Sequence, residues 1–281
     1  MSSPGKICWL SSYPKSGNTW MRALLTNYLS GAEQPMSIND LSVAPWGVRR
    51  ELFESLIGLE TSDMLEKELT AVRPAVYRHV SRQADDMLLC KIHDAYCKTH
   101  NGELLFPPDA TLASIYLVRN PLDVAVSFAH HQGWSLRDTV RVMENENFAL
   151  SLSRESLEHQ IPQRLGSWSS HVVSWVDQVD SPVLVLRYED ILEDAHACLA
   201  RVLEWIGLPV CPQKLAAAVD FSAFDELQKQ ELKSGFFEKN PAAPNFFRKG
   251  GSGHWHEELP EELVDRLCRR HGAVMQRFGY L

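Results

Sequence analysis

The sequence predicts an α/β fold in which a central, mostly parallel sheet is flanked by helices, and we interpret residues 1–281 as a single domain. Short apolar runs of strand length recur at 7–10, 87–92, 112–118 and 183–187. Segments with apolar side chains at helical spacing separate these runs, as expected for a parallel sheet covered on both faces. Polar clusters follow the first three runs. Ligands bind at the carboxyl ends of strands in such sheets, so these clusters are candidate site residues.

The helices predicted from apolar spacing are, in chain order, 19–29, 51–57, 62–69, 121–130, 168–179, 191–206 and 261–278. Pro121 suits a first helical turn, and Gly207 with Pro209 should end the helix before them. The polar segment 135–160 is also predicted to be helical and partly exposed. Residues 233–254 are rich in Gly, Pro, Asn and Lys and predict a long loop, of which 233–247 is a candidate lid.

Composition excludes several classes of protein. The formal net charge of −8 disfavours a nucleic-acid binder, although an anionic ligand needs only local positive charge. No apolar run reaches the length of a membrane span, and the N-terminus lacks the apolar core of a signal peptide. The six cysteines form no C-x-x-C pair or zinc pattern, so we expect reduced thiols in a cytoplasmic protein.

A candidate anion loop joins the first strand to the first helix. Gly17 lets the backbone approach a ligand closely, and successive N–H groups with the helix N-terminus form an anion site. Lys15 adds a full positive charge, and Ser16, Asn18 and Thr19 add hydrogen-bond donors. The alternative is an ordinary turn with a helix cap.

An ATP-binding Walker A loop needs Lys after its last Gly, whereas Lys15 precedes Gly17 and Asn18 follows it. No clear carboxylate partner for Mg²⁺ appears, so the loop suits a phosphate held without metal. Neither His130-His131 nor the pair His254 and His256 has the spacing of a helical ligand pair. We therefore expect no metal site.

The string Tyr13-Pro-Lys-Ser-Gly-Asn-Thr-Trp20 resembles the 5′-phosphosulfate loop of cytosolic-type sulfotransferases, YPKSGTTW, with Asn18 in place of Thr. The resemblance implies a P-loop-like sulfotransferase fold. It also implies 3′-phosphoadenosine 5′-phosphosulfate (PAPS) as donor, with adenosine 3′,5′-bisphosphate (PAP) as product. The resemblance further implies that the loop residues from Lys15 to Trp20 contact the nucleotide.

Two further segments resemble family motifs. Cys90-Lys-Ile-His93 is similar to the K-T-H segment, which implies that His93 is the catalytic base and that Lys91 helps to hold the sulfuryl oxygens. Histidine suits a base because its pKa lies near neutrality. The segment from Arg119 to Ser127 resembles R-N-P-x-D-x-x-x-S, whose Arg and Ser bind the 3′-phosphate. We interpret Asp123 only as a charge at a helix N-terminus.

The resemblance continues toward the C-terminal part of the chain. Arg187-Tyr-Glu-Asp190 implies that Tyr188 contacts the adenine side, and a looser match, Ser222-Ala-Phe-Asp-Glu-Leu227, implies adenine contacts for Ser222 and Phe224. Phe246-Phe-Arg-Lys-Gly250 resembles F-M-R-K-G, which places Arg248, Lys249 and Gly250 on the 3′-phosphate. His254 stands where the family often has Asp, which leaves its role open.

The implied reaction is direct in-line transfer of a sulfuryl group to a hydroxyl of a small or medium-sized acceptor. His93 would accept the proton while Lys15 stabilises charge on the leaving phosphate. The acceptor is not readable, although Trp46, Trp134, Phe236 and Phe237 could line an apolar pocket. Two alternatives stay open: a P-loop-type small-molecule kinase using ATP and Mg²⁺, and a catalytically inactive nucleotide-binding protein.

Overall fold

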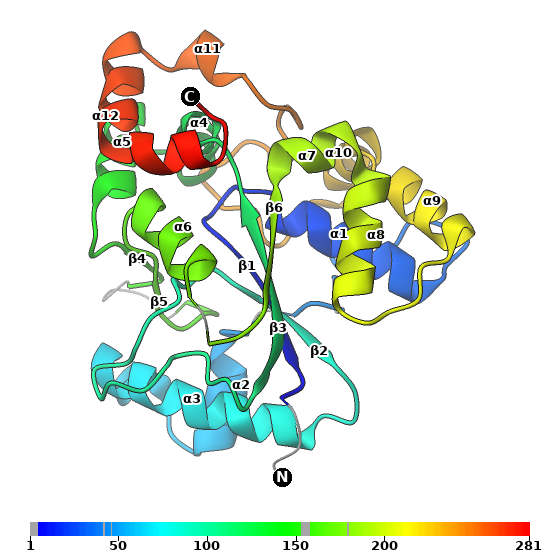
Figure 1. Ribbon diagram of the computed structural model, residues 1–281, viewed down its shortest axis with the longest axis vertical. Helices are drawn as coiled ribbons and strands as arrows, with labels where there is room; N and C mark the ends of the chain where they lie inside the picture. The colour runs from blue at the N-terminus through cyan, green and yellow to red at the C-terminus, as the bar shows by residue number, and fades with distance from the viewer. Residues whose placement is uncertain (1–4, 42, 46, 153–157, 179) are drawn as a thin grey trace. The chain divides into compact units, whose positions relative to one another are not determined.

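The computed structural model describes residues 5–41, 43–45, 47–152, 158–178 and 180–281. A four-stranded parallel sheet has the order β2-β1-β3-β6, and Figure 1 shows its strands side by side. A separate antiparallel pair joins β4 to β5. The predicted α/β class, with a central parallel sheet and flanking helices, is confirmed.

The strands are β1 (Ile7–Ser12), β2 (Leu88–Ile92), β3 (Thr111–Val118), β4 (Ala149–Leu150), β5 (Gln163–Arg164) and β6 (Val183–Arg187). The first helices are α1 (Asn18–Ser30), α2 (Arg50–Ile57), the 3₁₀ helix η1 (Thr61–Asp63), α3 (Glu66–Gln83), α4 (Pro121–Gln132), α5 (Leu136–Glu144) and α6 (Trp168–Val176). The remaining helices are α7 (Tyr188–Glu193), α8 (Ala195–Trp205), α9 (Pro212–Phe221), α10 (Phe224–Ser234), α11 (Trp255–Glu258) and α12 (Glu261–Arg277).

The chain divides into two compact units, each made of three separate segments. One comprises Met1–Tyr13, Pro45–Tyr116 and Asn145–Val185, and we call it the sheet unit because it holds β1, β2 and most of β3 and β6. The other comprises Pro14–Ala44, Leu117–Glu144 and Leu186–Leu281, and we call it the helical unit. The single-domain interpretation of the sequence stays a prediction.

The core of the sheet unit follows from the apolar runs. Every residue of β1 is buried, as expected for a parallel strand covered on both faces. β1 pairs with β2 so that Leu10 lies opposite Lys91, and the indole of Trp9 donates a 2.9 Å hydrogen bond to Oγ1 of Thr111 on β3. The four predicted strands correspond to β1, β2, β3 and β6.

The predicted helix 191–206 is wrong at its start, because two helices occupy this segment. α7 begins at Tyr188 and ends at Glu193, and Asp194 then leaves the helical conformation at φ −147° and ψ 86°. The Asp194 side chain caps α8 by accepting a hydrogen bond from the N–H of Ala197 at 2.9 Å. An Asp that competes for backbone N–H groups can interrupt an otherwise continuous apolar pattern.

The helix predicted over 135–160 is also too long. α5 ends at Glu144, and Ala149–Leu150 pairs with Gln163–Arg164 as an antiparallel ladder. α9 and α10 were not predicted, although Pro212 occupies the first turn of α9, where proline is favoured. Within the described ranges, the helices are all too short or too polar to cross a membrane.

Candidate active site

The predicted anion loop lies between β1 and α1 and carries two residues with left-handed backbone. Lys15 has φ 67° and Gly17, the N-cap of α1, has φ 96°. For lysine this conformation is strained, and such strain persists mainly where the surroundings enforce it, often at functional sites. Ser16 between them is fully buried, and its Oγ has no hydrogen-bond partner among the described residues. A buried donor without a partner at a nest of backbone N–H groups is a feature of an anion site.

The ring of Tyr188 packs against this loop. A Cβ at position 17 would lie 2.7 Å from Cδ2 of Tyr188, so only glycine permits the approach. The guanidinium carbon of Arg119 lies 4.3 Å from the centroid of the same ring, and Trp20 meets it edge-on at 5.8 Å. Burial raises the pKa of Tyr188, so the phenol stays protonated near neutral pH. Four residues predicted to bind the nucleotide therefore converge in the helical unit.

Arg119 joins two of the predicted loops. Its two terminal nitrogens donate to the main-chain carbonyls of Lys15 at 2.9 Å and Gly251 at 2.8 Å. Its Nε is buried and has no partner among the residues described. The fork predicted for phosphate thus holds the anion loop and the Gly-rich loop together, and Nε is a buried donor still available to a ligand.

Ser222, at the end of α9, and Phe224, at the start of α10, contact residues of the same two loops. The Ser222 carbonyl accepts a 2.9 Å hydrogen bond from the indole of Trp20, and its hydroxyl accepts one from Nδ2 of Asn27 at 3.0 Å. Gly250 has φ 62°, and a Cβ there would lie 2.1 Å from the Phe224 ring. Both residues thus fix the loops, and the adenine contacts implied by the resemblance stay predictions.

Arg248 and Lys249 are each paired with a carboxylate of α11. Nη1 of Arg248 lies 2.7 Å from Oε1 of Glu258, and Nζ of Lys249 lies 2.6 Å from Oε2 of Glu257 and 3.2 Å from Oε1 of Glu258. Nε2 of His130 lies 2.5 Å from the other oxygen of Glu258. Partial burial raises the pKa of Glu258, but its hydrogen bonds outweigh this and lower it to about 2. The carboxylate therefore gathers the two cations predicted to bind the 3′-phosphate.

Glu231 on α10 anchors the segment that precedes these cations. Its carboxylate accepts from the backbone N–H of Phe246 at 2.7 Å and of Phe247 at 2.8 Å, while Gln228 donates to the Phe247 carbonyl at 2.9 Å. Nζ of Lys15 lies 3.9 Å from the centroid of the Phe246 ring, a cation–π distance. Sequence reasoning missed Glu231. The available signal was its spacing of four residues from Leu227, which puts a charge on the buried face of α10.

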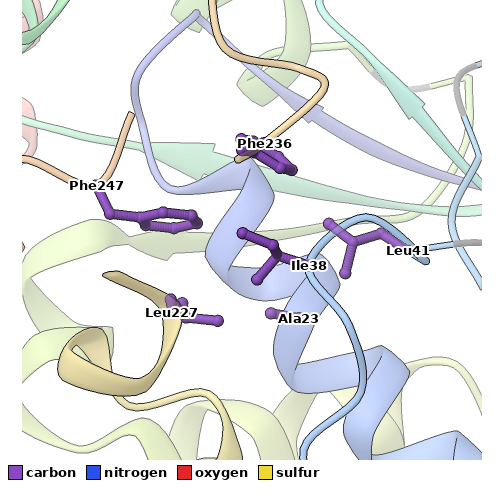
Figure 2. Close-up of a cluster of buried hydrophobic side chains, with 6 residues drawn as sticks. All are labelled: Ala23, Ile38, Leu41, Leu227, Phe236 and Phe247. Atoms are coloured by element: carbon purple, nitrogen blue, oxygen red, sulfur yellow. The ribbon is translucent and has the colours of Figure 1, made fainter. Parts of the chain in front are cut away.

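A hydrophobic cluster includes Phe247 of the segment held by Glu231. Figure 2 shows its six buried members, Ala23, Ile38, Leu41, Leu227, Phe236 and Phe247. Trp20, Phe224 and Phe246 pack against it. The candidate lid 233–247 is thus anchored through two buried phenylalanines, and gating by it stays a prediction. Of the other predicted pocket residues, Phe237 is 61% exposed, Trp134 is 37% exposed, and Trp46 lies outside the described residues.

Asp123 does more than place a charge at the start of α4, so that interpretation was incomplete. Its buried carboxylate accepts from the N–H of Gly253 at 2.8 Å and of Trp255 at 3.3 Å. His254 lies between them in sequence, with its imidazole close to Gly251. Ser127 lies one helical turn beyond Asp123 and is half-buried. Asp123 therefore fixes the end of the Gly-rich loop to the helix that follows Arg119.

Lys91 and His93 belong to the sheet unit. Lys91 lies near the carboxyl end of β2, and His93 comes just beyond it. Nδ1 of His93 lies 2.8 Å from the carbonyl oxygen of Ser12. A carbonyl only accepts, so Nδ1 carries the proton and Nε2 is the basic nitrogen. Lys91 is only 7% exposed. Over the described part of the chain, no three His, Cys, Asp or Glu side chains are grouped to hold a metal ion, and the metal-free site stays a prediction.

Comparison with known proteins supplies independent information. The profile of the family described as "Sulfotransferase domain" matches residues 6–279. The chain is 28% identical over 257 residues to bovine sulfotransferase 1A1, covering 88% of this chain and 75% of that protein. It is 24% identical over 285 residues to flavonol 3-sulfotransferase of Flaveria bidentis, with 92% and 78% coverage.

Solved structures share the fold. Mouse sulfotransferase SULT7A1, solved with PAP, superimposes with a TM-score of 0.63 at 17% identity, covering 98% of this chain and 86% of that one. Retinol dehydratase in complex with androsterone and PAP gives a TM-score of 0.63 at 19% identity, with 98% and 82% coverage.

Proposed function

The chain belongs to the sulfotransferase family, and on this premise we propose that it transfers a sulfuryl group from PAPS to a hydroxyl of a small or medium-sized organic acceptor. The observation that carries the choice of donor is the pair of buried polar atoms, Oγ of Ser16 and Nε of Arg119, without partners among the described residues. The two atoms lie in segments that contact each other, because Arg119 donates to the carbonyl of Lys15, the neighbour of Ser16, and packs on the ring of Tyr188.

The residues of the helical unit suit a doubly phosphorylated nucleotide. The loop from Lys15 to Trp20 would hold the 5′-phosphosulfate through backbone N–H groups, the ammonium and the Ser16 hydroxyl. Nε of Arg119, Ser127 and the loop from Arg248 to Gly250 would bind the 3′-phosphate, with the α11 carboxylates gathering the cations beforehand. Tyr188 and Phe224 supply aromatic surface for the adenine side.

Bound PAPS supplies an activated sulfuryl group, and the protein positions charge and moves one proton. His93 takes the acceptor's hydroxyl proton at Nε2, because Nδ1 donates to Ser12 and keeps the ring in that tautomer. Lys15 stabilises the negative charge that develops on the leaving phosphate, and Lys91 holds the sulfuryl oxygens. The transfer is direct and in line, so the chain forms no covalent intermediate.

The acceptor class is proposed from the relatives and the location from the thiols. Flavonol 3-sulfotransferase and hydroxysteroid sulfotransferases are named for hydroxylated small molecules, which supports an organic hydroxyl acceptor here. We propose a cytoplasmic location. Support comes from the six cysteines, which are all free thiols, and from a relative in Arabidopsis thaliana named cytosolic sulfotransferase 10.

Nucleotide titration and a transfer assay together test the proposed function. We expect calorimetry to show that PAP binds without added metal and more tightly than ADP, because ADP lacks the 3′-phosphate. Labelled PAPS presented with a panel of phenols, sterols and other alcohols should yield labelled product. Tight binding of Mg²⁺-ATP with indifference to PAP would instead support a kinase, and PAP binding without any turnover would support an inactive binding protein.

Arg119→Ala is expected to weaken PAP binding about ten-fold more than AMP binding, because a hydrogen bond to a charged group contributes about 1.5–3 kcal/mol. Competition calorimetry with the two nucleotides measures the difference. Arg137→Ala is the matched control, since this arginine of the same unit is exposed and bonds to Glu262. Equal loss for PAP and AMP in Arg119→Ala would mean that the side chain only holds the two loops together.

A further inference from the structure

His171 is a fully buried imidazole on α6 in the sheet unit. Its Nδ1 lies 2.8 Å from the hydroxyl of Tyr116, and its Nε2 lies 2.9 Å from the carbonyl oxygen of His93. The ring of Tyr13 meets it edge-on at 5.4 Å. Burying an imidazole among aromatic side chains is unfavourable unless its nitrogens are hydrogen-bonded. The two hydrogen bonds therefore account for an imidazole at this buried position, and one of them is made to His93, the residue we propose as the base.

The direction of both hydrogen bonds is fixed by chemistry. A carbonyl oxygen only accepts, so Nε2 of His171 carries the hydrogen and donates to His93. Nδ1 is then the acceptor for the Tyr116 hydroxyl. Burial lowers the pKa of His171 to about 4, despite opposing hydrogen bonds to the His93 and Asp94 backbone. His171 is consequently neutral, in one tautomer, across the pH range in which a histidine base operates.

Gln163 on β5 holds the other backbone group of His93. Its Oε1 accepts from the N–H of His93 at 2.8 Å, while its Nε2 donates to Oε1 of Gln160 at 2.9 Å. Gln163 is 1% exposed. His93 comes immediately after β2, which ends at Ile92, so the ladder no longer orders its backbone. Two side chains from elsewhere in the sheet unit do so instead.

The residue after His93 is fixed as firmly. The carboxylate of Asp94 accepts from Arg73 at 2.9 and 2.6 Å in a fully buried ion pair, and its carbonyl accepts from the Trp175 indole at 2.9 Å. These bonds hold the chain on one side of the base. The Asp94 contacts do not involve the N–H and carbonyl of His93 itself. Those two groups are bound by Gln163 and His171.

We propose that His171 and Gln163 are positioning residues that orient the His93 imidazole by clamping its backbone N–H and C=O. With both groups held, the Cα–Cβ direction of His93 is set, and the hydrogen bond from Nδ1 to the Ser12 carbonyl then sets the rotation of the ring. A displacement of about 1 Å can lower a rate about 100-fold, so the clamp has a measurable effect. The inference rests on the proposed role of His93 as base.

The test combines single and double substitutions. His171→Phe removes both hydrogen bonds in a ring of similar size, and we expect kcat to fall at least about 10-fold, while the Kd for PAP stays within about two-fold. His171→Gln keeps an amide donor that can reach the His93 carbonyl and should recover most of kcat. Gln163→Leu removes the acceptor from the other side and should repeat the kcat loss if His171→Phe proves poorly folded.

A double-substitution cycle separates positioning from general stabilisation. Because His171 acts through His93, adding His171→Phe to His93→Ala should change the residual rate less than about two-fold. An undiminished loss in that background would overturn the inference, as would full kcat in both His171→Phe and Gln163→Leu. His271→Phe, at a buried histidine of α12 in the helical unit, should lower the melting temperature and leave kcat unchanged. If His93→Ala itself keeps its activity, the proposed base fails first.

Discussion

Replacement of His93 by alanine is expected to lower kcat about 10²- to 10⁴-fold, because a positioned general base contributes about that much to proton transfer. The Nδ1 proton is committed to the Ser12 carbonyl at 2.8 Å, which leaves Nε2 as the basic nitrogen of the ring. Steady-state assays with saturating donor and acceptor measure the loss. The limb of the pH profile that reports ionisation of the free base should disappear with it.

Nucleotide binding provides the internal control for this prediction. All residues predicted to bind the nucleotide belong to the helical unit, whereas His93 belongs to the sheet unit. The Kd for PAP should therefore change less than about two-fold in His93→Ala. His100→Ala, at an exposed histidine of the same unit, should keep full activity. Retention of more than about a tenth of the original kcat in His93→Ala would remove His93 from the mechanism.

Gly17→Ala is expected to lower the affinity for PAP at least about 100-fold, equivalent to about 2.7 kcal/mol. Two effects combine at this position. The backbone has φ 96°, a conformation that is strained for alanine by about 1–3 kcal/mol. The new Cβ would also lie 2.7 Å from the Tyr188 ring, so the ring or the loop must move. Calorimetric titration with PAP measures the result.

Gly207→Ala separates backbone strain from the steric effect. Gly207 follows α8 with φ 74°, and a Cβ there would meet nothing within 4 Å. We expect both variants to lose stability, seen as a lower melting temperature, with the larger loss in Gly17→Ala because of the added contact with Tyr188. A loss of PAP affinity is expected only in Gly17→Ala. Unchanged affinity in Gly17→Ala would contradict a tight contact between the loop and Tyr188 in the nucleotide-binding state.

Much of the fold could be predicted, because the signals are local, and the same kind of signal identifies the candidate nucleotide-binding loop. The strand runs are mostly apolar segments of strand length, and the loop from Lys15 to Trp20 shows its glycine, its cation and its donors within a few residues. The break at Asp194 could not be predicted from apolar periodicity. It depends on whether an Asp side chain caps the next helix or points to solvent.

The supporting residues are less visible in the sequence because their partners are distant along the chain. Asp123 binds backbone groups 130 and 132 residues away, and His171 binds the carbonyl of a residue 78 positions earlier. Glu231 binds two backbone N–H groups that carry no side-chain signature. A buried Asp, Glu or His that serves a backbone group looks the same in one sequence as a solvated one, so only the tertiary fold distinguishes them.

Arg119 also has a consequence for biosynthesis. The two carbonyls that its guanidinium binds are 104 and 132 residues away in sequence, on opposite sides of it. Contacts over such separations form late, since loop-closure entropy opposes them until the intervening chain has folded. A nascent polypeptide should therefore stay unable to capture nucleotide until Gly251 has left the ribosome, because one of the two carbonyl partners of Arg119 is missing before that point.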